Sequence, residues 1–190
     1  KNIKIIPIFK KKGSSLELTN YRPIAIINAF SKITEIAIQK RIVPFLEKNG
    51  AFNQMQFGFR NNRSVHEAIT LNLNYIAHSI NENYFAGNLL LDVKKAFDCV
   101  DREILLAKLE NIGIRGNMLK WFTSYLSNRS MKVEIDGIIS SNEKKAHYGV
   151  LQGSVLSAAL FIYYINDLLS MLNQRNKIER ENPFNKEKMA

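Results

Sequence analysis

The sequence predicts an α+β fold in which helices pack against an antiparallel sheet. Two observations carry this prediction. Short apolar runs rich in β-branched residues and bounded by turn residues are typical of strands, and longer segments with apolar residues at helical spacing are typical of helices. Both kinds of segment alternate along the 190 residues, with no internal repeat and no linker-like stretch between them. We therefore expect a single domain of ordinary size.

The first fifty residues predict a hairpin followed by a helix. The hairpin consists of two strand-like runs, residues 3–9 and 21–27, joined by residues 10–20 with their Gly-Ser-Ser turn. From Ser31, apolar side chains recur at helical spacing until Asn49 and Gly50. Pro44 lies inside this pattern, so we expect it to kink or shorten the helix.

Two further helices have their own boundary signals. Ser64 stands three residues before Glu67, which is the spacing of a capping box and predicts a helix from there to about Asn81. Asp101 is expected to cap the next helix, which Gly113 ends. Both helices are therefore bounded by local signals.

The C-terminal part predicts one amphipathic helix, two short strands and one buried helix. Residues 117–129 have helical periodicity, and short strands are expected within residues 131–137 and 145–150. Residues 155–172 are so apolar that their helix should lie buried. Residues 173–190 lose all periodicity, and we expect a disordered tail there.

Positive charge is concentrated in the first third of the chain. Residues 1–63 contain twelve cationic and three anionic side chains, whereas residues 64–190 contain fifteen and fourteen. Such a lopsided basic region is typical of proteins that bind nucleic acid. A basic surface that only aids solubility would give the same composition, so both interpretations stay open.

Composition excludes several classes of site. No apolar run reaches the ~18 residues of a membrane span, so no membrane partner is expected. Cys99 is the only cysteine, which excludes an internal disulfide and a cysteine-based zinc site, and the three histidines are scattered. The chain begins with Lys1 and has no signal-peptide pattern, so we expect it to be an interior piece of a longer protein.

One strand-like run ends on an acid. Within residues 85–93, three leucines lead directly into Asp92, and burying an ionised carboxylate is costly unless it is paired, hydrogen-bonded or bound to metal. We expect this run to be a central strand with Asp92 at its carboxyl end beside a cleft, where an acid can bind magnesium. The alternative is that Asp92 caps a helix starting near Lys94.

Four blocks of sequence are similar, in order and spacing, to the reverse transcriptase of non-long-terminal-repeat (LINE-type) retrotransposons. They are NYRPIAIIN, QFGFRNNRSVHEAI, LLLDVKKAFDCVDREILLAKLENIGIRGNMLKWFTSYLSNR and GVLQGSVLSAALFIYYINDL. The resemblance covers about residues 1–172 and implies a right-hand polymerase, with fingers at about 1–85 and fingers with partial palm at about 86–172. It implies an RNA template, a DNA primer and deoxynucleoside triphosphates as partners, together with the remaining palm and thumb segments of the full-length polymerase. Enzymes of this family travel as ribonucleoprotein between cytoplasm and nucleus.

The resemblance gives roles to individual residues. Asp92 corresponds to the first metal-binding, catalytic aspartate of the palm, and the Val93 carbonyl to a further ligand of the two Mg²⁺ ions that support nucleotidyl transfer. Phe97 corresponds to the aromatic residue that excludes a ribose 2′-hydroxyl. Gln152 and Gly153 correspond to the family's Gln-Gly beside the incoming nucleotide and the template.

The basic N-terminal third also receives roles from the resemblance. Arg22 corresponds to an arginine that the fingers hairpin places over the incoming nucleotide. A lysine of the same hairpin, with Lys12 among the candidates, would reach the triphosphate. Arg60 and Arg63 would help to line the template path.

Taken alone, several of these residues have simpler interpretations. Phe97 is of a type that usually packs in a core, and Gln152 with Gly153 is compatible with a plain turn. Asp98 and Asp101 are expected at helix starts and not in the metal site. Four helix residues are expected to serve only in packing or at an exposed helix edge: Trp121, Phe122, Tyr125 and Asp167.

The resemblance fails at the second acidic motif. The family's polymerases carry an adjacent Asp-Asp pair a few tens of residues beyond Gln-Gly, and none is found here. The acids after Gln152 are Asp167, Glu179, Glu181 and Glu187. Leu151 also replaces the usual proline before Gln-Gly, which is expected to loosen the turn. We therefore expect little or no polymerase activity from the isolated chain, and two alternatives stay open: a non-catalytic nucleic-acid-binding remnant and a group II intron maturase-type reverse transcriptase.

Overall fold

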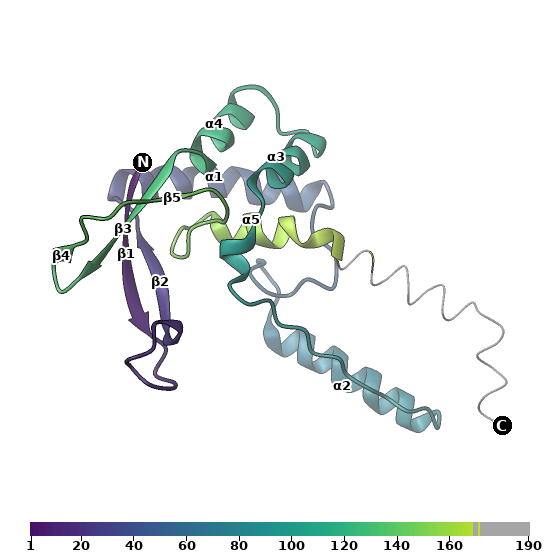
Figure 1. Cartoon of the computed structure of the whole chain (residues 1–190). Coiled ribbons are helices and arrows are strands. Elements are labelled where there is room, and N and C mark those ends of the chain that lie inside the picture. Colours follow the sequence, from purple (N-terminus) through teal and green to yellow (C-terminus); the bar gives the residue numbers. More distant parts are fainter. Residues whose placement is uncertain (169–170, 172–190) are drawn as a thin grey trace.

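The computed structural model describes residues 1–168 and residue 171, and it shows a small sheet beside a cluster of helices (Figure 1). The fold is mixed α and β, as predicted. Its main elements are β1 (Asn2–Phe9), β2 (Tyr21–Ile26), α1 (Ala29–Lys48), α2 (Val65–Asn81), α3 (Arg102–Asn111), α4 (Gly116–Leu126), β3 (Arg129–Ile135), β4 (Ile138–Ile139), β5 (Lys144–Ala146) and α5 (Ser157–Tyr164). Among the described helices, none has the length and apolar character needed to cross a membrane. The predicted tail, residues 173–190, lies outside the described residues.

The sheet is mixed, with the strand order β2-β1-β3-β4 and with β5 paired to β3. β1 and β2 form the predicted antiparallel hairpin, in which Ile5 lies opposite Ala25. β1 and β3 run parallel, with Ile3 opposite Met131. The predicted antiparallel sheet is therefore corrected to a mixed one. Parallel strands are joined through a long crossover, and local sequence patterns do not show which strands a crossover brings together.

The main hydrophobic core lies between α1, α3, α4 and α5. Leu46, Leu105, Phe122 and Leu160, one from each of these helices, are fully buried. The helical spacing of apolar residues predicts these faces, and α5 is buried as its composition indicates. A second, smaller core joins the hairpin to the turn before α5 and consists of Ile3, Ile5, Ala25 and Leu151.

The predicted helix caps are present. Ser64 Oγ accepts a 3.1 Å hydrogen bond from the Glu67 amide, and α2 ends at Asn81. Asp101 Oδ1 accepts a 3.1 Å hydrogen bond from the Ile104 amide at the start of α3. Each cap satisfies an amide that the helix itself leaves without an acceptor, so local sequence is sufficient to set these boundaries.

Pro44 does not shorten α1. The helix runs through this proline to Lys48, so of the two expected effects, a kink or a shorter helix, the shorter helix is wrong. Ile42 and Leu46 lie on either side of Pro44 and are buried in the main core. Tertiary packing therefore maintains the helix although proline removes one backbone hydrogen bond.

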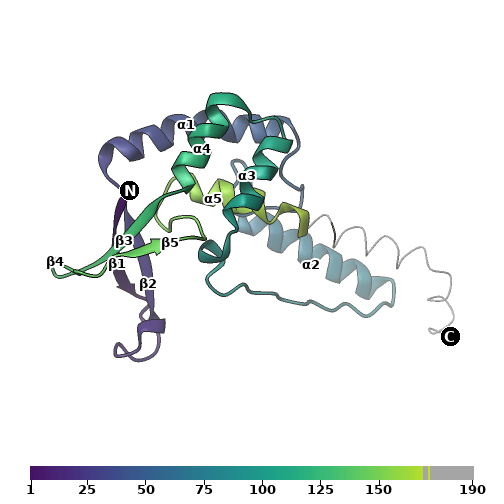
Figure 2. The same cartoon turned by 45° about the horizontal axis from the view of Figure 1, so that its top comes forward.

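α2 and residues 82–95 form an arm that extends away from the other helices (Figures 1 and 2). α2 buries only Ser79, and residues 82–95 return along it as an extended chain. The strand predicted at 85–93 is therefore wrong, and Leu90 is 92% exposed. A strand requires a neighbouring chain for its backbone hydrogen bonds, and no described segment pairs with this one.

Candidate functional site

Three distant segments that carry candidate residues meet at the turn before α5. The Ala25 amide of β2 donates a 2.7 Å hydrogen bond to the Gln152 carbonyl. The Val150 amide donates a 2.8 Å hydrogen bond to the Phe97 carbonyl. The turn therefore ties the hairpin that carries Arg22 to the segment that carries Phe97.

The glycine of the Gln-Gly pair is required by backbone contact with β2. Gly153 has a φ of +110°, and a Cβ at this position would lie 2.7 Å from the Ala25 carbonyl oxygen. A side chain would therefore collide with backbone atoms that cannot rotate away. The glycine allows a close backbone approach, and here the approaching chain is the protein's own strand β2. Leu151, in the place of proline, is buried in the second core.

Phe97 lies between α5 and the loop before α2 and is half-buried. Its ring stacks on that of Phe161, with centroids 4.9 Å apart and an angle of 23° between the planes. The ring of Phe59 meets it edge-on at 6.4 Å. Phe97 therefore packs against two other aromatic rings, as the simpler interpretation expects. Part of its side chain remains accessible to solvent.

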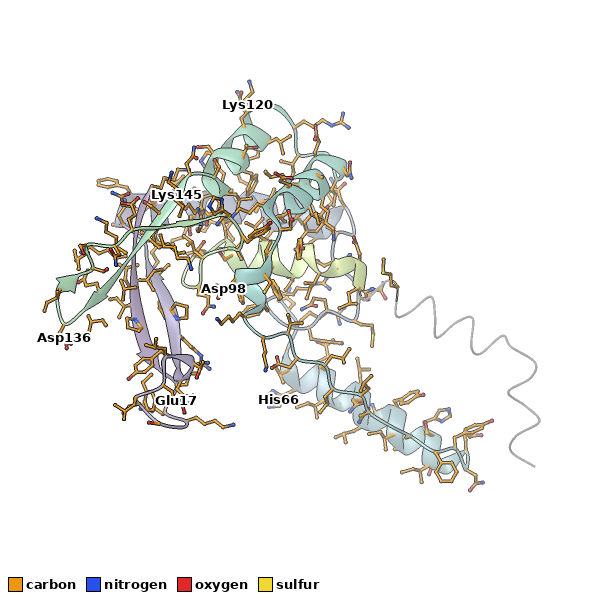
Figure 3. All side chains as sticks on the ribbon, in the orientation of Figure 1. Glu17, His66, Asp98, Lys120, Asp136 and Lys145 are labelled. Atoms are coloured by element: carbon orange, nitrogen blue, oxygen red, sulfur yellow. The ribbon has the colours of Figure 1, made fainter. Side chains whose placement is uncertain are left out.

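Asp98 adjoins the Gln-Gly turn, on the connection between the arm and the helices (Figure 3). Burial raises the pKa of the Asp98 carboxyl, whereas the charge of Lys95 and a hydrogen bond with the Gln152 side chain lower it. Asp98 lies within the short 3₁₀ helix Ala96–Cys99, which confirms its expected place at a helix start. Its contact with Gln152 is a feature that the sequence did not reveal.

Asp92 and Val93 are exposed on the extended part of the arm. The alternative role of Asp92 as a helix cap is wrong, because the 3₁₀ helix that follows begins after Lys95 and has no side-chain cap. Within residues 1–168 and 171, no group of three or more His, Cys, Asp or Glu side chains is placed to hold a metal ion. Asp92 and the Val93 carbonyl supply hard oxygen ligands of the kind that Mg²⁺ prefers, so they fit one part of such a site.

Arg22 and Lys12 are exposed on the β1–β2 hairpin. Arg22 lies opposite Ile8 in the strand register, and Lys12 lies in the connecting turn. The Lys10 ammonium donates a 2.8 Å hydrogen bond to the Thr19 carbonyl and so helps to close the turn. The hairpin, which contacts the Gln-Gly turn through Ala25, therefore presents two cationic side chains to solvent.

The two arginines predicted to line a template path differ in their surroundings. Arg60 donates to both Glu47 carboxylate oxygens, at 2.6 and 3.0 Å, and its side chain is 11% exposed. It also donates to the Asn53 carbonyl at 2.7 Å. Arg63 is more open and forms a 2.6 Å ion pair with Glu67. Arg60 therefore holds the loop after α1, and Arg63 is the more accessible of the two.

Glu35 is a buried acid that the sequence analysis missed. It is 2% exposed, and its carboxylate accepts hydrogen bonds from the Tyr125 hydroxyl at 2.9 Å, Ser154 Oγ at 2.8 Å and the Val155 amide at 3.0 Å. Burial raises the pKa of Tyr125, which keeps its hydroxyl protonated. Because Ser154 and Val155 follow Gly153 directly, Glu35 fixes the Gln-Gly turn to α1 and α4. Helical spacing from Ile42 was the available signal, since it places Glu35 on the buried face.

Arg102 is a second buried charge that the sequence analysis missed. Its guanidinium donates to the carbonyls of Ala146, Tyr148 and Gly149 at 2.6, 2.7 and 2.9 Å. Burial, together with the charge of Arg129, lowers the pKa of Arg102 to about 10, so it remains a cation at neutral pH. Arg102 thereby holds the chain that leads from β5 into the Gln-Gly turn.

The packing contacts expected for the helix residues are present. Phe122 is fully buried, and the Trp121 ring stacks on the Tyr125 ring at 4.8 Å with an angle of 12°. Asp167 forms a 2.7 Å ion pair with Lys108 at an exposed position. These side chains therefore need no role in a metal site to explain their positions.

Comparison with known proteins finds a match to one family and to several relatives. Residues 9–185 match the family model described as reverse transcriptase (RNA-dependent DNA polymerase). The chain is 30% identical over 164 residues to the RNA-directed DNA polymerase from mobile element jockey of Drosophila funebris, covering 86% of this chain and 18% of that protein. It is 32% identical over 165 residues to the probable RNA-directed DNA polymerase from transposon X-element of Drosophila melanogaster, with the same coverage of both. It is 26% identical over 166 residues to the retrovirus-related Pol polyprotein from type-1 retrotransposable element R2 of Popillia japonica, covering 87% of this chain and 23% of that protein. The chain thus spans about a fifth of the length of these relatives.

Proposed function

The chain belongs to the reverse transcriptase (RNA-dependent DNA polymerase) family, and we propose on that basis that it forms the fingers and part of the palm of a retrotransposon polymerase that copies RNA into DNA. The proposed fingers are about residues 1–85, and residues 86–172 complete them and begin the palm. Its proposed partners are an RNA template, a DNA primer and deoxynucleoside triphosphates.

The convergence of three segments at the Gln-Gly turn is the observation that carries the proposal. Hydrogen bonds bring the hairpin with Arg22, the segment with Phe97 and the turn with Gln152 into one region, although they lie far apart in sequence. A nucleotide site needs a cation for phosphate, an aromatic surface for the sugar and backbone close to the base. These three segments supply those groups.

Asp92 and the Val93 carbonyl are proposed to hold Mg²⁺ in the complete polymerase. Two such ions stabilise the attacking and leaving oxygens of an in-line displacement at phosphorus when they are bound. The exposed carboxylate of Asp92 can accept this role without first breaking an internal ion pair, since it has none among the described residues. The acid that completes the ligand set is proposed to come from an Asp-Asp hairpin outside this sequence.

The remaining residues are proposed to position the nucleotide and the template. Arg22 and Lys12 are proposed to contact the triphosphate, because both are exposed cations on the hairpin. Phe97, with Gln152 and Gly153, is proposed to border the sugar and base. Arg63 is proposed to contact template phosphate.

Arg60 is proposed to act on the template path indirectly. It would do so by holding the loop after α1, since its donors are engaged by Glu47 and Asn53.

Residues 85–93 are proposed to become a palm strand in the complete polymerase. Leu89, Leu90 and Leu91 are exposed, and their backbone pairs with no strand of the described part. Exposed apolar runs with free backbone groups are unfavourable unless another chain segment covers them. A strand from the rest of the palm would supply both the backbone partners and the cover.

Primer extension tests the proposed activity. We expect the 190-residue chain to extend a DNA primer on an RNA template with Mg²⁺ at a rate indistinguishable from background. A longer chain that includes an Asp-Asp hairpin is expected to extend it, because the second acid completes the ligands for two ions. Full activity of the short chain would contradict the proposed incomplete metal site, and inactivity of both chains with intact RNA binding would favour the non-catalytic remnant.

RNA affinity as a function of salt concentration tests the proposed contact between Arg63 and the template. We expect the affinity to fall with salt, and Arg63→Gln to reduce the slope of log affinity against log salt by roughly 0.7, because one phosphate contact is lost. Lys120→Gln is the matched control, because Lys120 is an exposed cation on α4 and no contact with RNA is proposed for it (Figure 3). A flat salt response of the unmodified chain would contradict a basic template path.

A further inference from the structure

A cavity of about 410 Å³ lies between the start of α1, the end of α4 and the first strand. None of the residues assigned above to the metal, the nucleotide or the template lines it. Its volume falls in the range of roughly 300–1,000 Å³ that is usual for small-molecule sites. It is therefore a second candidate site, separate from the exposed segment with Asp92.

Arg129 is a buried cation at this cavity with an unused donor. The residue is 3% exposed, Nε donates to the Tyr125 carbonyl at 2.7 Å, and the guanidinium lies 4.3 Å from the centre of the Tyr125 ring. Nη1 is buried and has no hydrogen-bond partner within the described part of the chain. A buried donor without an acceptor is costly, and an anion in the cavity would satisfy it.

The N-terminus of α1 faces the same cavity through Asn28 and Ser31. The Asn28 side chain accepts from the Ser31 amide, and the earlier amides of the first turn have no acceptor within the helix itself. The positive end of the helix dipole therefore adds to the charge of Arg129. Helix N-termini with a nearby cation commonly bind phosphate groups.

The other charges at the cavity are unequal. The Lys1 ammonium lies at the edge of the cavity and donates to the Ser124 carbonyl. Burial lowers the pKa of Lys1, and the nearby charge of Arg129 lowers it further. Glu35 is the only acid lining the described cavity, and its carboxylate is already occupied by three hydrogen bonds. The site therefore has cationic groups in excess. A phosphate group has more acceptor oxygens than a carboxylate, so it suits a guanidinium and a helix N-terminus together.

We propose that this cavity binds the phosphate group of a nucleotide, with Arg129 and the start of α1 holding the phosphate and Trp121 contacting the base. Trp121 lines the cavity and stacks on Tyr125, so it offers a fixed aromatic surface. The phosphate can belong to a free nucleotide or to a nucleotide within a strand, and both present the same chemistry.

Fluorescence of Trp121 tests the proposal directly, because this residue is the only tryptophan in the chain. Titration of the 190-residue chain with adenosine monophosphate is expected to give a saturable change that inorganic phosphate reverses by competition. Ser31→Glu is expected to weaken binding at least about tenfold, because it places a negative charge against the phosphate. Ser31→Gln, of similar size to Ser31→Glu and without charge, is expected to weaken binding clearly less, so that the difference between the two variants measures the effect of the charge.

Both substitutions lie at an exposed position, and thermal unfolding of each variant checks that the chain remains folded. Reversal of the adenosine monophosphate signal by a short single-stranded oligonucleotide would support a nucleotide within a strand, and no reversal would support a free nucleotide. The proposal is overturned by the absence of a saturable change, by equal affinity in Ser31→Glu, or by acetate that competes as well as phosphate. None of these outcomes depends on polymerase activity.

Discussion

Asp92→Asn, in a longer chain that contains an Asp-Asp hairpin, is expected to lower the rate of DNA synthesis by about 10³-fold. Asparagine keeps the size of the side chain but removes the charge that binds a divalent cation. Metal ions contribute several kcal/mol to stabilising the transition state of such reactions, and each 1.4 kcal/mol corresponds to roughly tenfold in rate. The measurement is single-turnover primer extension on an RNA template at saturating Mg²⁺.

The matched control for this prediction is Asp136→Asn. Asp136 lies in the turn between β3 and β4, far from the arm, and its φ of 50° is one that asparagine readily adopts (Figure 3). We expect this variant to retain activity within about twofold. RNA affinity should be unchanged in both variants, because neither residue is proposed to contact the template. An Asp92→Asn enzyme with near-normal extension would exclude Asp92 from the metal site.

Glu35→Ala is expected to destabilise the chain by about 3 kcal/mol, which is the second large effect. The substitution leaves the Tyr125 hydroxyl, Ser154 Oγ and the Val155 amide without their acceptor. Each buried donor that loses its partner costs roughly 1–3 kcal/mol, and relaxation of the turn recovers part of the total. The midpoint of thermal unfolding should fall by roughly 6–12 °C.

Two variants separate the hydrogen-bond network from a general effect of removing an acid. Glu35→Gln keeps one acceptor oxygen and is expected to cost less than half as much as Glu35→Ala. Glu110→Ala removes an exposed acid from the last turn of α3, and no loss of stability is expected. Equal stability of Glu35→Ala and the unmodified chain in urea unfolding would show that the three donors find other partners.

Local sequence was sufficient to predict an element where the signal and its structural effect lie a few residues apart. Ser64 and Asp101 each bond to amides within three residues, so their helix starts follow from spacing alone. The hairpin follows from two β-branched runs around a Gly-Ser-Ser turn. The burial of α5 follows from its uniformly apolar composition.

Local sequence was insufficient to predict an element where contacts with a distant part of the chain decide whether it forms. Residues 85–93 have the composition of a strand, yet a strand forms only beside another, and none of the described strands lies there. Pro44 would end an isolated helix, yet burial of Ile42 and Leu46 maintains α1. The parallel pairing of β1 with β3 depends on a crossover that no local pattern encodes.

For the candidate site too, the sequence determined one part and the tertiary structure decided the other. The order and spacing of the sequence blocks determined the family and the residue types of the site: an acid at Asp92, an aromatic ring at Phe97 and Gln-Gly at residues 152 and 153. The tertiary structure decided which of these meet, through the bonds from Ala25 to Gln152 and from Val150 to Phe97. It also identified Glu35 and Arg129, because the energy of a buried charge depends on the groups that surround it. The partners of Glu35 are Tyr125, Ser154 and Val155, which lie 90 to 120 residues along the chain.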